Sequence, residues 1–349
     1  MLRYPLLGLT LFALAVRAWT FGNPVIHVDD QFYMLVGQRM WEGALPYVDI
    51  WDRKPIGLFL IYALTSALPV GPVLGYQLAA TLCVIGTAWL IWRMARDLAG
   101  PVAALAGAMT YVAWLPLFGG IGGQSPVFYN LLVVLAVWLT LPLVTGKSAA
   151  LTRRGCTIML IVGAAMQIKY SALFEGMFLG LTLLWLGWRS GRSLPRLAGD
   201  GTLWVACALL PTALAWGWYA AVGHGDAFYQ ANFVSVFQDA LSRPEAFWRL
   251  FWQMLGLLPF WLCLGIVWRQ RASLSPQGRW LIGWAMAALG GYLAFGNWFD
   301  HYVLPMLVPL SVIAAMAFAR IRHQRLAMAL VVGLGLAAGV SRAAVDMAD

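Results

Sequence analysis

Residues suited to chemistry are concentrated in one polar segment, between positions 21 and 55. Five of the fourteen acidic residues of the chain fall there, together with four basic or imidazole side chains. A carboxylate can accept the proton of an attacking hydroxyl group, and neighbouring carboxylates can shift each other's pKa or recruit a divalent cation. A simple connecting loop does not need these groups. The residues concerned are Asp29, Asp30, Glu42, Asp49, Asp52, His27, Arg39, Arg53 and Lys54.

Lys169 is the clearest ionisable residue outside that segment. It follows an apolar stretch at 158–166 and precedes Tyr170 and a second apolar stretch that contains Glu175. Ionisable side chains at the centre of a bilayer cost about 2.5–3.5 kcal/mol or more, so those that persist usually have a function. The alternative is a lysine at the end of a helix whose ammonium group reaches the membrane surface.

A third polar cluster contains Asp300, His301 and Tyr302. Ordinary loop polarity with a tyrosine at the membrane interface explains this cluster as well as a binding role does. We keep His301 and Tyr302 as binding candidates.

Membrane helices must position these groups. The chain has 349 residues, of which 62% are hydrophobic and 11% charged, whereas a soluble domain has about 45–50% apolar and about 25% charged residues. Long uncharged stretches recur along the chain, and a helix of roughly 20 such residues crosses the hydrocarbon core. The composition excludes a water-soluble globular protein and predicts an all-α polytopic membrane protein.

Basic residues set the orientation, because Lys and Arg collect in cytoplasmic turns. One outward and one returning helix fit between successive basic turns, which places the polar segment 22–54 on the outer face. Other outer connections then fall near 118–125, 169–171, 223–247 and 297–301. We expect a single domain over 1–349 with roughly eleven spans, the N-terminus cytoplasmic and the C-terminus outside. The basic turns contain Arg93 and Arg96; Lys147, Arg153 and Arg154; Arg189, Arg192 and Arg196; Arg269, Arg271 and Arg279; and Arg320, Arg322 and Arg325.

The apolar run at 55–70 is predicted not to cross the membrane. If this run and the next one, at 73–92, both spanned it, every later basic turn would face outward, against the bias of four other turns. Pro55 at the start of the run and the break from Pro69 to Pro72 at its end permit a juxtamembrane or re-entrant helix instead.

A surface helix is expected at 31–41. Phe32, Leu35, Val36 and Arg39 to Met40 stand there at helical spacing, which is typical of an amphipathic helix on the outer membrane surface. Asp29 and Asp30 would stand at its N-terminus, where the helix dipole favours carboxylates. One of these aspartates could therefore be only an N-cap.

Two runs of residues resemble the first outer loop of the C-type membrane glycosyltransferases that take a sugar from polyprenyl phosphate. They are His27-Val-Asp-Asp-Gln-Phe-Tyr33 and Gly43-Ala-Leu-Pro-Tyr-Val-Asp-Ile-Trp-Asp-Arg-Lys-Pro55. The family includes protein O-mannosyltransferases and the lipid A aminoarabinose transferase. In it an Asp-Asp or Asp-Glu pair opens this loop and Lys-Pro closes it, as Asp29-Asp30 and Lys54-Pro55 do here.

Three weaker similarities follow in the family's order. Gly123-Gln-Ser-Pro-Val-Phe128 resembles an outer turn that often holds an acidic residue, and Ile168-Lys-Tyr-Ser-Ala172 resembles a Thr-Lys turn. His301-Tyr-Val-Leu-Pro305 resembles a late Tyr-x-Leu-Pro helix. Ser125 departs from the pattern, because many members have Asp or Glu there. We expect no soluble C-terminal domain, since nothing after Val340 corresponds to the one that some relatives append.

The resemblance implies a reaction and a role for each matching residue. A polyprenyl-phosphate sugar exchanges its phosphate for an acceptor hydroxyl group at the anomeric carbon, which requires a base for the acceptor and cations for the phosphate. Asp29 is the implied base, and Asp30 orients it or holds the sugar. Lys54 and Lys169 are implied to bind the phosphate. Further substrate-binding candidates are Arg53, Tyr33, Tyr170, His301 and Tyr302, and the aromatic residues Tyr33, Trp41, Trp51 and Tyr62 are candidates for lining the path of the lipid.

The expected partners are a polyprenyl-phosphate-linked sugar, a lipid, glycan or protein acceptor, and the bilayer. The second large outer loop, 223–247, is expected to shape the acceptor site. Basic turns account for the net charge of +9 without nucleic acid. The sequence requires no cofactor and leaves a divalent cation open, and the spacing of the four cysteines carries no disulfide or metal signal.

The expected location is the inner membrane of a bacterial cell, with the site on the periplasmic face. Two other interpretations stay open at this stage. A transporter or lipid flippase would place ionisable residues near mid-membrane on several helices, and the departure at Ser125 leaves room for a noncatalytic relative. Neither the sugar, the acceptor nor the length of the lipid follows from the sequence.

Overall fold

The computed structural model describes residues 4–146, 150–235, 243–294 and 296–346. Within these ranges the chain forms helices joined by turns, and its one β pairing is an isolated bridge between Pro46 and Ile50. Lys147 in the second basic turn and part of the second outer loop lie outside the described residues. The all-α prediction is confirmed for the part of the chain that the structure describes.

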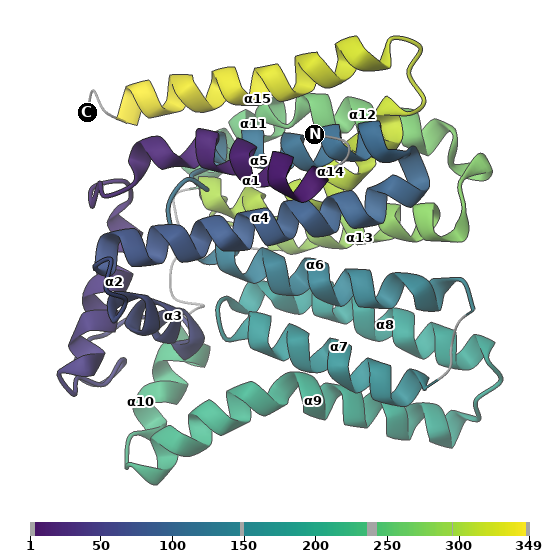
Figure 1. Cartoon of the computed structure of the whole chain (residues 1–349). Helices are drawn as coiled ribbons and strands as arrows, with labels where there is room; N and C mark the ends of the chain where they lie inside the picture. Colours follow the sequence, from purple (N-terminus) through teal and green to yellow (C-terminus); the bar gives the residue numbers. More distant parts are fainter. Residues whose placement is uncertain (1–3, 147–149, 236–242, 295, 347–349) are drawn as a thin grey trace. The chain divides into compact units, whose positions relative to one another are not determined.

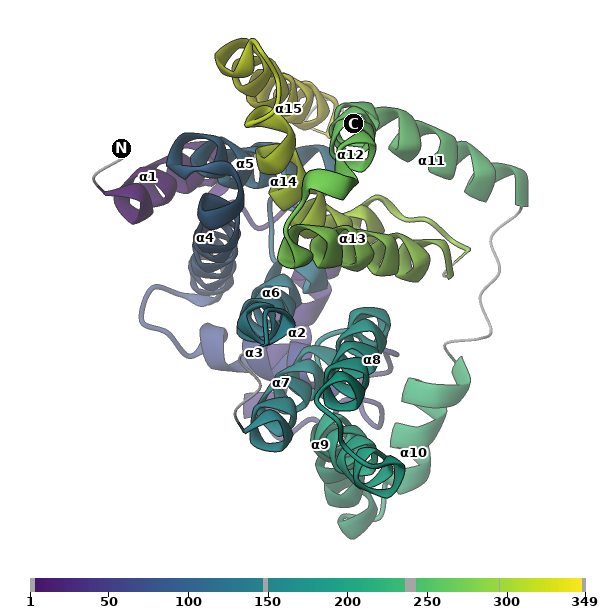
Figure 2. The same ribbon diagram turned by 90° about the vertical axis from the view of Figure 1, so that its right-hand side faces the viewer.

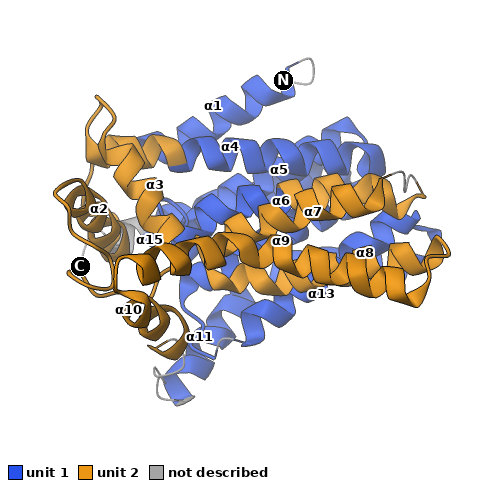
Figure 3. Cartoon of the chain, turned by 90° about the horizontal axis from the view of Figure 1, so that it is seen from below, with its two compact units in different colours: residues 1–21, 80–134, 241–349 blue, residues 22–79, 135–240 orange. Residues whose placement is uncertain are grey.

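The chain forms two compact units, drawn in separate colours in Figure 3. Unit 1 comprises residues 1–21, 80–134 and 241–349, and unit 2 comprises residues 22–79 and 135–240. The division falls inside α4 (Pro72–Ala99) and α6 (Ser125–Val144), so these two helices contribute to both units. The single domain expected over 1–349 thus consists of two units, each discontinuous in sequence.

Helix α14 (Leu304–Phe318) is the core of unit 1, since every residue after Pro305 in this helix is buried. Gly107 brings α5 close to it, because a Cβ atom at this position would lie 2.7 Å from the carbonyl oxygen of Ser311. Helices α12 and α13 pack on α14 as well, and α1 and α15 pack on α5 (Figure 2). The bounds are α1 Pro5–Arg17, α5 Pro101–Trp114, α12 Leu258–Arg269, α13 Pro276–Ala294 and α15 Gln324–Asp346.

Arg17 ties the end of α1 to the rest of unit 1. Its buried guanidinium donates hydrogen bonds to the carbonyl oxygens of Gly120 and Gly122, at 2.6 and 2.8 Å, and to the Thr81 hydroxyl at 3.0 Å. Hydrogen bonds from a charged donor offset the cost of burying it. This arginine therefore fixes the turn that precedes Ser125.

Unit 2 is built on three packed helices, α7 (Leu151–Met166), α8 (Leu173–Arg189) and α9 (Leu194–Ala221), which run side by side in Figure 1. Glycines allow α7 and α9 to approach closely. A Cβ atom at Gly163 would lie 2.4 Å from the carbonyl oxygen of Ala208. Small residues are the usual means of bringing membrane helices together.

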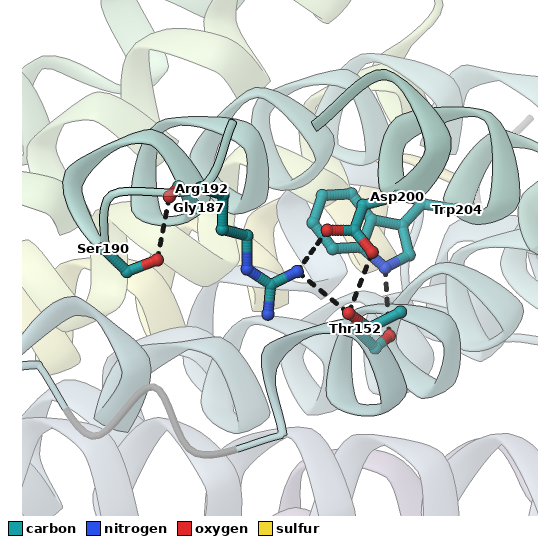
Figure 4. A network of polar contacts seen from close by, with 6 residues as sticks. All are labelled: Thr152, Gly187, Ser190, Arg192, Asp200 and Trp204. Carbon is teal, nitrogen blue, oxygen red and sulfur yellow. Dashed lines mark hydrogen bonds and ion pairs between the residues drawn. The ribbon is translucent and has the colours of Figure 1, made fainter. Parts of the chain in front are cut away.

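A polar network joins α7, α9 and the turn between α8 and α9, at the end where the basic turns lie (Figure 4). Arg192 forms an ion pair with Asp200 of α9 and donates to the Thr152 hydroxyl of α7 at 2.9 Å. Thr152 donates in turn to Asp200 at 2.8 Å, and the indole N–H of Trp204 donates to the Thr152 carbonyl oxygen at 3.0 Å. The network lies at the start of α7, and the opposite end of this 16-residue helix is roughly 24 Å away.

The first outer segment contains a helix pair, α2 (Val28–Trp41) and α3 (Ile56–Ser66), which pack directly on each other. The expected helix is present, and its buried face is Asp30, Tyr33, Val36 and Gly37. Of the predicted stripe Val36 is buried, whereas Phe32 is half-buried and Leu35 is exposed. The stripe was only partly correct because contact with α3, a short helix, decides which face of α2 is buried.

Helix α3 is too short to cross a bilayer. Its 11 residues rise roughly 16 Å, about half the thickness of the hydrocarbon core. This agrees with the expectation that the run at 55–70 does not span.

The described residues contain seven helices long and apolar enough to cross a membrane. An eighth span results if the pair Pro244–Gly256 and Leu258–Arg269, bent by 61° at a short break, is counted as one. Helices α1, α7 and α13 are not among them, so the expected count of roughly eleven is not confirmed. The chain is an integral membrane protein, as its composition indicates.

Gly37→Ala is expected to weaken unit 2. A Cβ atom at Gly37 would lie 2.6 Å from backbone atoms of both Tyr62 and Ala63, so α2 and α3 would have to separate. Overpacking of this kind costs about 1–3 kcal/mol, and the thermal midpoint of the purified protein should fall by several degrees.

Gly217→Ala is the matched control, since Gly217 lies within α9 and has nothing within 4 Å of its Cβ position. Its thermal midpoint should be unchanged or slightly higher, because alanine favours the helix. Equal midpoints for the two variants would contradict the close contact between α2 and α3.

Candidate active site

Four charged side chains from three separate segments of unit 2 lie near enough to act on one another electrostatically. Asp29 lies in the first turn of α2, Asp52 and Lys54 lie just before α3, and Lys169 joins α7 to the short helix η3 (Tyr170–Ala172). The charge of Asp29 acts on both Asp52 and Lys169, and the charge of Lys54 acts on the same two groups. The structure thus brings together Asp29, Lys54 and Lys169, which the sequence analysis singled out.

A close backbone contact brings the segment that follows Lys54 next to the segment that precedes Lys169. A Cβ atom at Gly57, in the first turn of α3, would lie 2.7 Å from the carbonyl oxygen of Gln167, at the end of α7. The side-chain amide nitrogen of Gln167 also donates to the Thr212 hydroxyl of α9 at 2.6 Å. The beginning of α3 is therefore seated on the α7 and α9 pair, which carries Lys169.

The two neighbouring aspartates of α2 have different surroundings. The half-buried Asp29 accepts a hydrogen bond from Tyr33, whereas the fully buried Asp30 contacts the Tyr62 hydroxyl of α3. His27 occupies the N-cap position of α2 and the aspartates follow it, so the N-cap interpretation is wrong for both. Asp29 faces the charged cluster, and Asp30 helps to hold α2 on α3.

Tyr47 fixes the turn that leads to Lys54. Its backbone is left-handed, with φ 71°, a conformation that costs a side-chain-bearing residue about 1–3 kcal/mol unless its surroundings enforce it. The enforcing contacts are a hydrogen bond from its N–H to Ile50 at 2.8 Å and one from its hydroxyl to the Lys54 carbonyl oxygen at 2.7 Å. Its ring also packs on Phe59 and Tyr219.

Asp52 belongs to the cluster although the sequence analysis did not place it among the site residues. Burial raises the pKa of this carboxyl above its usual range, while Lys54 and the hydrogen bond from the Arg53 N–H, at 2.6 Å, oppose the shift. The nearby Asp29 charge raises the pKa further. Arg53 thus partly neutralises Asp52.

Lys169 is held in surroundings that favour loss of its proton. Burial lowers the pKa of its ammonium group well below the usual value, and the like charge of Lys54 lowers it further. Asp29 acts in the opposite direction. A second negative group placed between the two lysines would relieve their repulsion, so the cluster is arranged to accept an anion.

The aromatic residues predicted to bind substrate or to line the path of the lipid differ in their exposure. Tyr33 and Tyr62 are buried, which corrects the expectation that they line the path of the lipid, whereas Trp41 and Trp51 are exposed. The half-buried Tyr170 donates from its hydroxyl to Asn232 at 3.0 Å.

His301 and Tyr302 lie in unit 1, so their assignment to the same site stays a prediction. Beside them Asp300 has structural partners. It accepts a hydrogen bond from Gln253 at 2.9 Å and pairs with Arg342 at 3.3 Å. Ser125 also belongs to unit 1 and is buried.

The described residues contain no group of three or more His, Cys, Asp or Glu side chains that would suit a metal ion. Asp29 and Asp30, the pair considered for a divalent cation, contact different tyrosines. The divalent cation stays an open prediction without support from a ligand cluster.

Sequence reasoning did not identify Tyr47 and Asn232 as part of the site. No sequence signal pointed to these two residues. The lysine content did point to the charged cluster, since the chain has 20 arginines but only three lysines, Lys54, Lys147 and Lys169. Two of the three meet in this cluster. A lysine, unlike an arginine, is a compact point charge whose pKa responds to burial.

Comparison with known proteins shows the fold. No family model matches the chain, and no curated protein matches it by sequence. Among solved structures it is similar to ArnT from Cupriavidus metallidurans bound to undecaprenyl phosphate, with a TM-score of 0.65, 16% identity, and coverage of 95% of this chain and 62% of that one. It is also similar to the oligosaccharyltransferase AglB from Archaeoglobus fulgidus in complex with an inhibitory peptide and a dolichol-phosphate, with a TM-score of 0.53, 12% identity, and coverage of 98% and 56%.

These similarities extend over nearly the whole chain but only part of each neighbour. The chain spans 62% of ArnT and 56% of AglB. At such low identity the likeness shows the fold alone, which this chain shares with ArnT and AglB over nearly its whole length.

The proton of Lys169 provides a direct test of the cluster. The rate of acetylation of Lys169, followed by mass spectrometry from about pH 7 to 11, should reach its midpoint below that of the same lysine in the unfolded protein, whose usual pKa is about 10.4. Lys54→Met should raise the midpoint by removing a like charge, and Asp29→Asn should lower it.

Arg39→Met is the control, because Arg39 pairs with the exposed Glu42 at 2.6 Å and does not act on Lys169. Its midpoint should equal that of the wild type. A Lys169 midpoint that coincides with the unfolded value, or that ignores the Lys54 substitution, would disprove the proximity of the two lysines.

Proposed function

We propose that this protein is a membrane glycosyltransferase that moves a sugar from a polyprenyl-phosphate donor to an acceptor hydroxyl group. The observation that carries the proposal is the meeting of Asp29, Lys54 and Lys169 in one cluster. A carboxylate beside two ammonium groups supplies what such a transfer needs, which is a base for the acceptor and positive charge for a phosphate. The shared fold with ArnT and AglB supports the same activity.

Binding of the donor is the first step. Lys54 and Lys169 hold its phosphate, and each ammonium group contributes a charge-assisted hydrogen bond. The anion also offsets the repulsion between the lysines, so donor binding raises the pKa of Lys169. Arg53 belongs to the same loop and adds positive charge near Asp52.

Transfer follows in a single displacement. The acceptor oxygen attacks the anomeric carbon as Asp29 takes its proton, and a new bond forms between that oxygen and the carbon. The bond between the carbon and the phosphate oxygen breaks, and its electron pair leaves with the polyprenyl phosphate. Negative charge grows on the phosphate during this step, and the two lysines stabilise it more strongly than in the ground state.

Tyr33 acts as a positioning residue. Its hydroxyl donates to Asp29 from the buried side of α2, so the carboxylate is held toward the cluster. Asp30 acts through Tyr62 and the packing of α2 on α3. The catalytic assignment for this pair is therefore reduced to Asp29, and Asp30 holds the helix that carries it.

The lipid part of the donor explains why the site belongs to a membrane protein. A polyprenyl chain remains in the bilayer, so its phosphate must be approached at the membrane surface. The exposed Trp41 and Trp51 lie in the first outer segment, and tryptophan is enriched at membrane interfaces. We place the site on the periplasmic face and leave the sugar and acceptor open.

Separate assays of binding and transfer test these roles. Lys54→Met and Lys169→Met should each weaken the binding of undecaprenyl phosphate to the purified protein about tenfold or more, since a hydrogen bond to a charged group contributes about 1.5–3 kcal/mol. Asp29→Asn should leave that binding within about twofold but lower transfer at least 100-fold, the lower end of the usual contribution of a general base.

Transfer is read by mass spectrometry of glycans and lipids from cells that lack the protein and carry each variant. Lys147→Met serves as the control for loss of a lysine and should behave as wild type in both assays. Restoration of all glycans by Asp29→Asn would exclude Asp29 as the base. Undiminished binding of undecaprenyl phosphate to the double variant of Lys54 and Lys169 would exclude the phosphate site.

A further inference from the structure

A ladder of three aromatic rings extends from the charged cluster of unit 2. Tyr170 follows Lys169 directly, and its ring lies 5.8 Å from that of Phe233. The ring of Phe233 lies 5.7 Å from that of Tyr229. Phe233 is 39% exposed and Tyr229 is 52% exposed. These rings therefore present an aromatic surface that starts at a lysine of the proposed active site.

The backbone of the second outer loop is shaped to present these rings. Residues Gly225–Tyr229 form α10, and Gln230–Val234 continue it as a π-helix. Such local widening of a helix is rare and frequently occurs at functional sites. Here it turns Asn232 into the core, where it is 1% exposed, and leaves the next residue, Phe233, at the surface.

Asn232 connects this surface to the backbone of the two segments that carry Lys54 and Lys169. Its side-chain oxygen accepts a hydrogen bond from the Tyr170 hydroxyl at 3.0 Å, and its nitrogen donates to the Phe228 carbonyl oxygen at 3.0 Å. It also contacts the hydroxyl of Tyr47, which donates to the Lys54 carbonyl oxygen. Tyr170 adjoins Lys169 in sequence, so the ladder is linked to the anion site from two sides.

We propose that Tyr170, Phe233 and Tyr229 form a saccharide-binding platform beside the phosphate site, in a proposal that rests on the function given above. The C–H faces of a sugar ring pack well on aromatic rings, while the sugar hydroxyl groups need polar neighbours. The platform supplies both, because its exposed Tyr229 ring carries a phenol hydroxyl. An isoprenoid chain would instead require continuous apolar contact.

Either the sugar of the donor or a sugar of the acceptor has this chemistry. The donor sugar is bonded to the phosphate itself, and the acceptor must reach the same anomeric carbon. Both therefore lie next to Lys169 during the reaction. The platform residues were not among the site residues expected from sequence, except Tyr170.

Saturation-transfer NMR on the purified protein in nanodiscs tests the platform. The probes are the methyl glycosides of glucose, mannose, galactose and arabinose, with farnesol as the isoprenoid probe. At least one glycoside should receive saturation in the wild type, and Phe233→Ala should weaken its binding at least fivefold. Phe233→Tyr should restore it, because the ring is kept.

Two controls separate this proposal from the proposed function. Phe251→Ala removes an aromatic ring that is 54% exposed but lies in unit 1, and it should leave glycoside binding unchanged. Undecaprenyl phosphate should bind Phe233→Ala as it binds the wild type, which also shows that the variant is folded. If the proposed phosphate site is wrong, undecaprenyl phosphate will bind the Lys54 and Lys169 variants as it binds the wild type. That result does not depend on the glycoside measurements.

A further arm identifies the source of the sugar. Farnesyl-phosphoryl mannose should displace the glycoside if the platform holds the donor sugar, and should leave it bound if the platform holds the acceptor. Either outcome supports a saccharide platform. Absence of saturation transfer to every glycoside, or loss of farnesol binding instead of glycoside binding in Phe233→Ala, would overturn it.

Discussion

Two ammonium groups held beside each other in half-buried surroundings are the constraint on which the rest of unit 2 depends. Lys54 and Lys169 repel each other, and burial adds to the cost of their charges. A fold retains such an arrangement only where other contacts enforce it. Here the contact of Gly57 with Gln167 and the left-handed turn at Tyr47 do so, since both fix the backbone around Lys54. The two lysine charges destabilise each other in the free protein. An anion that binds between them is attracted by both and removes this repulsion.

The helices of unit 2 supply the rigidity that this arrangement needs. Helices α7 and α9 pack closely through Gly163 and are fastened at the far end by Arg192 and Asp200. The short α3 is seated on the other end and carries α2, whose first turn presents Asp29. The Tyr219 hydroxyl of α9 donates to the Pro46 carbonyl oxygen of the first outer segment at 3.0 Å. The Tyr170 hydroxyl donates to Asn232 of the second outer loop, which ties that loop to the segment after α7. Base, anion site and aromatic platform are thus attached to one support.

The features of the fold and the site that depend on local sequence pattern could be predicted from the sequence. Hydropathy gave the all-α membrane fold, and the cost of an intramembrane charge directed attention to Lys169. The pair Asp29-Asp30 and the Lys54-Pro55 step were recognisable through the family resemblance. Contacts between distant segments were not predictable, because no local pattern encodes them. The buried face of α2 was only partly predicted for this reason, Tyr33 and Tyr62 proved to be core residues, and Asn232 and Tyr47 emerged only from the packing of two loops.

The central claim is that one anion binds between Lys54 and Lys169. It is tested most directly by cross-linking with a short amine-reactive diester followed by mass spectrometry, which is readable because the chain has only three lysines. The account predicts a cross-link between Lys54 and Lys169 in the free protein, and its loss when undecaprenyl phosphate is added but not when undecaprenol is added. Absence of the cross-link in the free protein, or its persistence in the presence of undecaprenyl phosphate, would contradict the account.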